Sequence, residues 1–219
     1  MKRNGCIIQL NEGKRMTVNE VISLANGGEL KGLAVKGDQE TIVGYINLGL
    51  IELYKRFPIS TKEFVIALND GTEIYTMPDD FMYVVAAYGE VEEGSDDIVS
   101  ILAINEEDNP LSINTVSWNQ VQIPVPLEGS YISLIYVASP TILTVNELTA
   151  VVPIAPQMLE ALLHYIGYRG HSSVNGEIQA ENSTHYTRFD ASCARIETLG
   201  LVTSDDLNMN SKFSSRGFV

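Results

Sequence analysis

The chain has only two cysteines, Cys6 and Cys193, in 219 residues. Two thiols near opposite ends make neither a disulfide framework nor the three or four ligands of a zinc site. Cys193 falls in an apolar pattern of helical period, so we expect it to be buried. The cysteine pattern therefore gives no indication of redox chemistry.

Basic residues are also scarce, with 14 Lys and Arg against 28 Asp and Glu and a formal net charge of −14. Binding nucleic acid by neutralising its phosphates needs clustered Lys and Arg, so this class of function is excluded. An acidic wall could still surround DNA, because like charge lets a polyanion pass without adhering. The same charge equally suits a solubilising surface, so it permits a DNA conduit without requiring one.

Long apolar runs are missing as well. Charged or polar residues interrupt every candidate before the roughly 18 residues that a membrane span requires. The first residues, MKRNGCIIQLNEGKR, have too short an apolar stretch for a secretory signal. Because hydrophobic residues make up 45% and charged residues 19% of the chain, it is typical of globular proteins. We expect a soluble protein that is not exported by a signal peptide and has no membrane partner.

Sequence motifs of enzymes are absent. The glycines and lysines of residues 25–38 lack the spacing of a phosphate-binding loop, and no G-x-S-x-G elbow occurs. The acidic stretches 90–97 and 106–109 do not match an EF-hand, and we expect them to be solvated turns. We therefore predict no enzyme activity, no cofactor, and no catalytic, cofactor-binding or metal-ligating residues.

Two helices are predicted in the N-terminal part. Thr17 and Glu20 form a capping-box pattern, and apolar residues then repeat at helical spacing until Gly27. A longer apolar stripe begins between Asp38 and Thr41 and ends before Pro58, with basic residues in its last turn.

After Pro58 the apolar period changes from 3.6 to 2, which is typical of strands. We predict that KEFVIAL and TEIYTMP form a hairpin across Asn69-Asp70-Gly71, since Asp-Gly tolerates positive φ angles. About four more extended segments follow, giving a small antiparallel sheet or sandwich over residues 61–139. Trp118 lies in one of these segments, where core or interface positions are usual.

The helical period returns at Pro153, in PIAPQMLEALLHYIGYRG, and again over residues 177–199 after a break near SSVNG. The last nineteen residues are rich in Ser, Asn and Asp, with Phe213 and Phe218 as isolated apolar anchors. A polar terminal segment with so few anchors seldom orders alone, so we expect a neighbouring subunit to hold it.

These patterns predict an α+β fold in which N- and C-terminal helices pack as a bundle around an inserted antiparallel β module. The expected divisions are residues 1–58 (N-terminal helical part), 59–150 (β module), 151–200 (C-terminal helical part of the same bundle) and 201–219 (extended C-terminal arm).

The stretch EALLHYIGYRGHSS places His164, Tyr168 and His171 on one face of a helix, with Arg169 beside them. At 1.5 Å per residue the two histidines are about 10 Å apart along the axis, too far to share a metal ion. Catalysis by His171 with the neighbouring serines is not indicated, because no G-x-S-x-G elbow exists and the serines lie at a fraying helix end. We interpret the stretch as a polar and aromatic edge that meets another helix or subunit, with small glycines allowing close approach.

Taken together, the chain resembles the head-to-tail adaptor (connector) proteins of short-tailed bacteriophages. The resemblance covers residues 17–200 and is carried by T-V-N-E-V-I, Y-K-R-F-P, Y-T-M-P-D-D, P-I-A-P-Q-M-L-E-A-L-L-H-Y-I-G-Y-R-G-H-S-S and H-Y-T-R-F. In this family an aromatic-rich Y-x-x-x-R segment follows an apolar run, and Tyr165, Tyr168 and Arg169 occupy those places. The C-terminal arm and the N-terminal leader have no fixed counterpart in the family.

The resemblance implies a structural virion protein at the head-tail interface, assembled in the host cytoplasm. Such adaptors form rings, commonly dodecameric, between the portal protein and the tail tube or nozzle, and genomic DNA passes through the lumen. Residues expected at subunit or portal contacts are Tyr168, Arg169, His171, Phe213, Arg216, Phe218 and Val219. The alternatives are a tail nozzle, tube or head-completion component and, further from the pattern, a virion-associated hydrolase.

Overall fold

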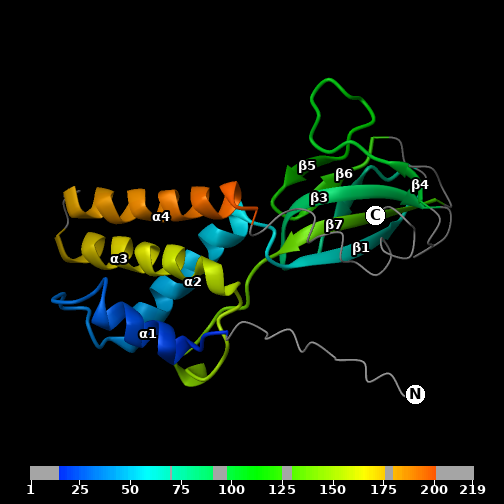
Figure 1. The fold of residues 1–219 in the computed structure, drawn as a ribbon. Helices are drawn as coiled ribbons and strands as arrows, with labels where there is room; N and C mark the ends of the chain where they lie inside the picture. Colours follow the sequence, from blue (N-terminus) through cyan, green and yellow to red (C-terminus); the bar gives the residue numbers. More distant parts are fainter. Residues whose placement is uncertain (1–14, 70, 91–97, 125–129, 176–179, 201–219) are drawn as a thin grey trace, which may run out of the picture. The chain divides into compact units, whose positions relative to one another are not determined.

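The computed structural model of the chain describes residues 15–69, 71–90, 98–124, 130–175 and 180–200. These ranges contain four α-helices and two antiparallel sheets, which confirms the predicted α+β class (Figure 1). The helices are α1 (Val18–Gly27), α2 (Gln39–Arg56), α3 (Leu159–Asn175) and α4 (Ala180–Thr198). The strands are β1 (Thr61–Ala67), β2 (Ile74–Thr76), β3 (Phe81–Glu90), β4 (Ile98–Ile101), β5 (Asn114–Ser117), β6 (Gln120–Gln122) and β7 (Tyr131–Ala138).

The chain divides into two compact units. Unit 1 comprises residues 1–46 and 143–193, and unit 2 comprises residues 47–142 and 194–219. Helices α2 and α4 contribute residues to both units, because the divisions fall inside them. In the part of the chain that the structure describes, no helix is both long and apolar enough to cross a bilayer.

Unit 1 is built from helices whose ends the sequence predicts well. The capping box at α1 is present: Thr17 Oγ1 accepts from the Glu20 amide at 3.3 Å, and Glu20 Oε2 accepts from the Thr17 amide at 2.9 Å. Helix α2 stops at Arg56, before Pro58. Cys193 is fully buried, as its position in the apolar pattern of α4 predicts.

Segments from both ends of the chain pack together in unit 1. Val18 donates its amide to the Ala150 carbonyl at 3.0 Å, and Val152 donates to the Met16 carbonyl at 2.9 Å. Helix α1 packs on α3, and α3 lies beside α4 (Figure 1). The buried face of α3 includes Ala161, Leu162 and Ile166, so apolar contacts hold the N-terminal segment to the C-terminal helices.

Unit 2 contains the β structure. One sheet has the strand order β1-β7-β3-β4 and the other β2-β6-β5, and all pairings are antiparallel. Strand β7 lies inside the larger sheet and is buried along almost its whole length. Side chains of both sheets share one apolar core that includes Val121 and Leu134. Tyr83 of β3 also donates its hydroxyl to the Tyr54 carbonyl of α2 at 3.4 Å.

The predicted hairpin between the first two strands is wrong. Strand β1 pairs with β7 over its full length, from Thr61 opposite Val137 to Ala67 opposite Tyr131, whereas β2 pairs with β6 in the other sheet. Gly71 does have the expected positive φ of 72°, but the turn leads the chain from one sheet to the other. All seven residues of β1 pair with the buried β7, whereas β2 has only three residues that could pair with it.

A second difference concerns the segment that contains Trp118. It forms two short strands, β5 and β6, with Trp118 at the turn between them and 70% exposed. Trp118 is therefore not a core residue. The stretch Glu106–Asp108 is exposed, as predicted, while residues 91–97 lie outside the described part of the chain.

Candidate functional site on the α3–α4 pair

An aromatic cluster joins α3 to α4. The ring centroids of Tyr165 and Phe189 are 5.3 Å apart, and those of Tyr168 and Tyr186 are 5.2 Å apart. Both pairs meet edge to face, the arrangement that the quadrupole of aromatic rings favours. Tyr168, predicted as a contact residue from its place on the helix face, thus packs within its own chain, while Tyr186 remains 43% exposed.

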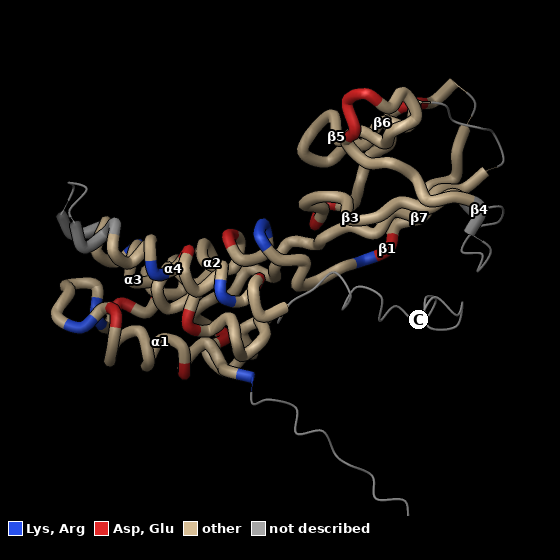
Figure 2. The backbone as a smooth tube through the Cα atoms, turned by 45° about the horizontal axis from the view of Figure 1, so that its top comes forward, with Lys and Arg blue, Asp and Glu red and all other residues tan. Residues whose placement is uncertain are grey.

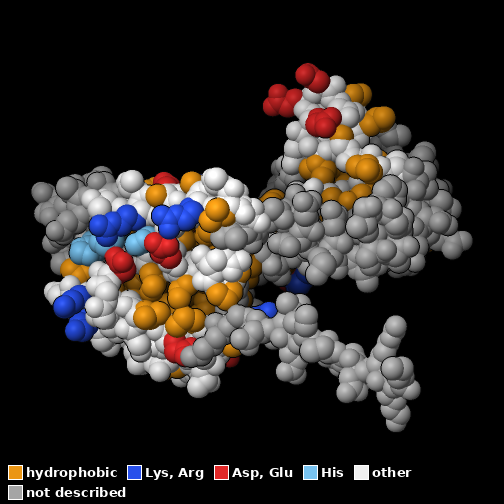
Figure 3. Space-filling view, in the orientation of Figure 1, with side chains coloured by type: hydrophobic (Ala, Val, Ile, Leu, Met, Phe, Trp, Pro, Cys, Tyr) orange, Lys and Arg blue, Asp and Glu red, His pale blue; other side chains and the backbone are white. Residues whose placement is uncertain are grey.

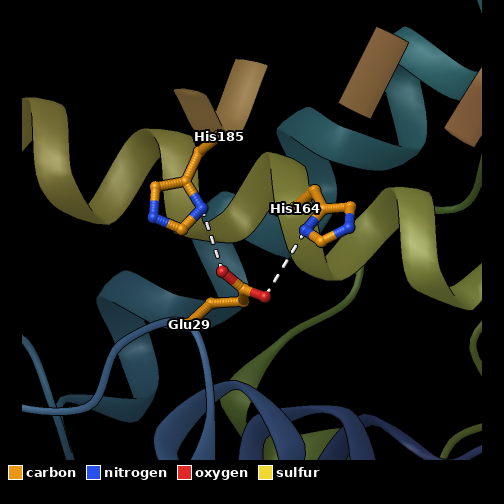
Figure 4. A group of neighbouring side chains, drawn as sticks. All are labelled: Glu29, His164 and His185. Atoms are coloured by element: carbon orange, nitrogen blue, oxygen red, sulfur yellow. Dashed lines mark ion pairs between the residues drawn. The ribbon is translucent and has the colours of Figure 1, made fainter. Parts of the chain in front are cut away.

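A second cluster lies on the neighbouring side of α3 and gathers His164, His185 and Glu29 (Figure 4). Glu29 comes from the loop after α1, His164 from α3 and His185 from α4. His185 Nδ1 is 2.9 Å from Glu29 Oε2, and His164 Nδ1 is 3.4 Å from Glu29 Oε1. Figure 4 shows the carboxylate between the two rings, with one oxygen toward each. We call these three residues the His-Glu cluster.

Burial within unit 1 gives the cluster unusual electrostatics. The side chains of His164, His185 and Glu29 are 15%, 12% and 21% exposed. Burial lowers the pKa of His185, with the nearby charges of His171, Arg188 and His164 acting in the same direction and Glu29 opposing them. The neutral imidazole of His185, which keeps one nitrogen lone pair free, is therefore favoured at neutral pH.

His171 lies next to this cluster rather than in it. Its ring stacks on that of His185 with centroids 4.6 Å apart, and its Nε2 is 3.2 Å from the backbone oxygen of Glu29. His164 thus faces the carboxylate of Glu29, whereas His171 faces the backbone oxygen of the same residue. The histidine that shares the Glu29 carboxylate with His164 is His185, which belongs to α4.

Two glycines let the loop after α1 approach α3. A Cβ at Gly170 would lie 2.3 Å from Leu30 Cδ2, and a Cβ at Gly167 would lie 2.9 Å from His185 Nδ1 and 3.1 Å from Glu29 Oε2. Any larger residue would therefore collide with the loop or with the His-Glu cluster. The sequence predicted that these glycines allow another helix or subunit to come close. The segments that come close in this structure, the loop after α1 and α4, belong to the same chain.

The remaining predicted contact residues fall into two groups. Arg169 is partly buried, and its Nε forms no hydrogen bond. Phe213, Arg216, Phe218 and Val219 lie outside the described residues. Sequence reasoning missed Glu29 and His185, because neither carries a local motif that relates it to His164; only the packing of α4 and of the α1 loop on α3 brings them together.

A different surface feature occurs in unit 2, where large apolar side chains are exposed on strands of both sheets and on loops between them. Ile101 is 80% exposed and Trp118 70%, and Ile74, Leu111 and Val116 are exposed as well. Figure 3 shows hydrophobic side chains over this part of the molecule, with acidic side chains beside them. We call these five residues the apolar surface of unit 2. Exposed apolar groups that form a contiguous patch are typical of protein contact sites.

Charge is divided unequally along the chain. Residues 59–150 contain fifteen acidic residues and a single basic one, Lys62, so this segment alone accounts for the formal charge of −14. The remaining residues have equal numbers of acidic and basic side chains. Among the residues that Figure 2 colours, most Lys and Arg lie on the helices or on the segments next to them. The β segment is therefore the part that would repel a polyanion.

Comparison with known proteins agrees with the resemblance drawn from the sequence. The profile of the family described as SU10 adaptor protein matches residues 16–211, which includes residues of both units. No curated protein matches the chain. Because the match covers nearly the whole chain, from the segment before α1 to beyond α4, the chain belongs to the SU10 adaptor protein family, a family of phage head-to-tail adaptors that are structural components of the virion.

Proposed function

We propose that this chain forms a ring, dodecameric by resemblance to other adaptors, between the portal protein and the tail tube or nozzle of a short-tailed phage. The observation that carries the proposal is the family match over residues 16–211, since it includes both the helical and the β parts.

The acidic β segment supports a role beside moving DNA. Genomic DNA would pass through the ring lumen without sequence-specific binding, and the charge of −14 concentrated in residues 59–150 would oppose its adhesion. The same segment has only Lys62 to offer a phosphate. A wall of this composition would let DNA slide during ejection.

The apolar surface of unit 2 supports contacts with other subunits. Exposed aromatic and aliphatic side chains such as Trp118 and Ile101 gain free energy when a partner covers them, by about 25 cal/mol per Å² of buried apolar area. Trp is also the residue most often found at the centre of protein interfaces. We infer that this surface meets a neighbouring copy or the portal.

The helical part would offer a second contact region. Tyr168 and His171 pack against side chains of their own chain and would hold the α3–α4 surface in place. The exposed Tyr186 and the partly exposed Arg169 would contact the partner on that surface. We further propose that residues 201–219 act as an arm that reaches an adjacent protein through Phe213, Arg216, Phe218 and Val219. Removal of the arm is expected to leave the fold intact and to weaken assembly, as electron microscopy would record.

Mass photometry of the purified chain, with and without its cognate portal protein, tests the proposal. Rings of the chain, or a complex whose mass exceeds that of the portal by a dozen copies, would support the adaptor role. Closed rings that do not bind the portal but bind tail proteins would instead support a nozzle, tube or head-completion role. A monomer that binds neither would contradict both.

A further inference from the structure

We propose that His164, His185 and Glu29 form a binding site for a divalent transition-metal ion of the zinc class. The ion would join the loop after α1 to α3 and α4 within unit 1. The proposal concerns the folded chain itself and does not depend on the ring or on any partner.

The donor atoms have the right chemistry and spacing. One ligand atom from each residue lies within 4.8 Å of the other two. Two imidazole nitrogens and one carboxylate form a common set of protein ligands for zinc, with a fourth position left for water. Zinc bonds of about 2.0–2.2 Å in a tetrahedron place ligand atoms roughly 3.4 Å apart. His185 Nδ1 lies 2.9 Å from Glu29 Oε2 and His164 Nδ1 lies 3.4 Å from Glu29 Oε1, so each nitrogen is about one such edge from one of the two carboxylate oxygens.

The two facing nitrogens have no other partner. Nδ1 of His164 and Nδ1 of His185 are both buried from solvent and neither makes a hydrogen bond, even though each lies near a Glu29 oxygen. The Glu29 carboxylate is therefore the polar group that both buried nitrogens face. A metal ion among the three side chains would satisfy both nitrogens and the carboxylate at once.

Gly167 keeps space open at the cluster. A Cβ at this position would lie 2.9 Å from His185 Nδ1 and 3.1 Å from Glu29 Oε2, which are two of the proposed ligand atoms. Glycine is poorly suited to a helix interior, where it costs about 1 kcal/mol relative to alanine. Its presence at this place in α3 leaves room that alanine would fill.

Outer residues are placed to orient the ligands. Glu160, one turn before His164, has a carboxylate oxygen 3.8 Å from His164 Nε2, the ring nitrogen that faces away from Glu29. A carboxylate that accepts a hydrogen bond from this nitrogen fixes the tautomer of a metal-binding histidine, and Glu160 would do so by moving closer than 3.8 Å. His171 stacks on His185, and its Nε2 lies 3.2 Å from the Glu29 carbonyl, so it holds both a ligand ring and the loop.

Such an ion would stabilise unit 1 by linking distant parts of the chain. Glu29 lies far from His164 and His185 in the sequence, so a shared ion closes long loops that the unfolded chain leaves open. Because the ion binds only where the three side chains are assembled, binding free energy adds to folding stability. The loop after α1 would gain most, since Glu29 is its only ligand.

The first experiment uses the full chain, purified without an added histidine tag and stripped of metal by a chelator. Titration with ZnCl2 is expected to show saturable binding of one ion per chain and a rise in Tm, whereas MgCl2 should produce neither. Titration with CoCl2 gives a readout that needs no variant: visible d–d absorption typical of tetrahedral nitrogen and oxygen ligation. Absence of saturable zinc binding and of these bands would overturn the proposal.

Variants locate the site. His185→Gln and His164→Gln are each expected to abolish stoichiometric binding, and Gly167→Ala should do the same while keeping every ligand. Gly44→Ala is the matched control, since a Cβ at this helical glycine of α2 would meet nothing within 4 Å; it should bind as the native chain does. His171→Gln should keep the stoichiometry and weaken affinity by about 10- to 100-fold.

Circular dichroism of each metal-free variant separates loss of a ligand from loss of the fold. Stoichiometric binding that persists in both His185→Gln and His164→Gln would place the ion elsewhere and overturn the assignment. Cobalt bands of the native chain that also survive unchanged in Gly167→Ala would contradict the position proposed for the ion.

Discussion

The hydroxyl of Tyr136 on β7 donates to Asp80 Oδ1 at 2.9 Å, while Lys62 on β1 binds the other oxygen of the same carboxylate. The hydrogen bond from Lys62 is the main cause that lowers the pKa of Asp80. Burial, followed by the hydrogen bond to Asp80 and its charge, raises the pKa of Tyr136 to about 12. These three side chains connect two neighbouring strands of the larger sheet to the turn before β3.

The raised pKa of Tyr136 predicts a loss of stability in alkali. An unfolded tyrosine ionises near 10, so between pH 10 and about 12 the unfolded state releases a proton that the folded state retains. The free energy of unfolding should therefore fall across this interval. In Tyr136→Phe the fall should be shallower, although the variant loses about 1 kcal/mol at neutral pH with its hydrogen bond.

Urea denaturation at a series of pH values measures this effect. Tyr45→Phe removes a tyrosine hydroxyl from α2 and serves as the control for loss of a tyrosine elsewhere in the chain. Equal slopes in the native chain and Tyr136→Phe would show that the contact with Asp80 does not shift the ionisation of Tyr136.

The packing of Gly170 predicts a large difference between two glycine substitutions. Gly170→Ala would put a Cβ 2.3 Å from Leu30 Cδ2, and Leu30 is fully buried, so we expect a cost of about 1–3 kcal/mol. Gly44→Ala meets open space within α2 and should stabilise by up to about 1 kcal/mol. Chemical denaturation of both variants checks the pair. A Gly170→Ala variant as stable as Gly44→Ala would refute the close approach of the loop after α1.

Exposed Trp118 predicts a substitution that weakens assembly and spares the fold. Trp118→Ser removes a side chain that is 70% exposed, so the free energy of unfolding should change by less than about 0.5 kcal/mol. If this residue is central to an interface, association should weaken by about 2 kcal/mol or more. Thr115→Ala, an exposed position on β5, is the control and should assemble normally. Normal assembly of Trp118→Ser would show that Trp118 does not contribute to the interface.

The acidic β segment predicts that salt promotes ring formation. In the proposed ring, neighbouring copies of residues 59–150 would repel one another, and raising the ionic strength toward ~0.15 M shortens the Debye length to about 8 Å. We expect the fraction of rings in mass photometry to rise with NaCl until this repulsion is screened. A fall in ring fraction over the same interval would mean that attraction between opposite charges dominates the interface.

Local signals account for the features that the sequence predicts correctly. The capping box at Thr17, the end of α2 before Pro58 and the burial of Cys193 each depend on near neighbours or on helical period. Strand pairing depends instead on which distant segment offers the best partner. Asp-Gly after β1 suggested a hairpin, yet β7 is the longer and more buried partner, and β1 joins it.

The His-Glu cluster shows the same limit at the candidate site. Spacing along α3 relates His164 only to His171, and it contains no information about α4 or the loop after α1. His185 and Glu29 reach His164 only through the packing of three segments, which Gly167 permits. The family, in contrast, was evident from motifs spread along the chain, because it depends on the whole pattern and not on one site.

Electron microscopy of the chain mixed with its cognate portal tests the adaptor role most directly. End-on and side views should show a closed ring of the chain, twelve-fold by resemblance, bound to one face of the portal with an open lumen. Portal rings that carry no added density, beside a chain that remains monomeric at every ratio, would contradict the account.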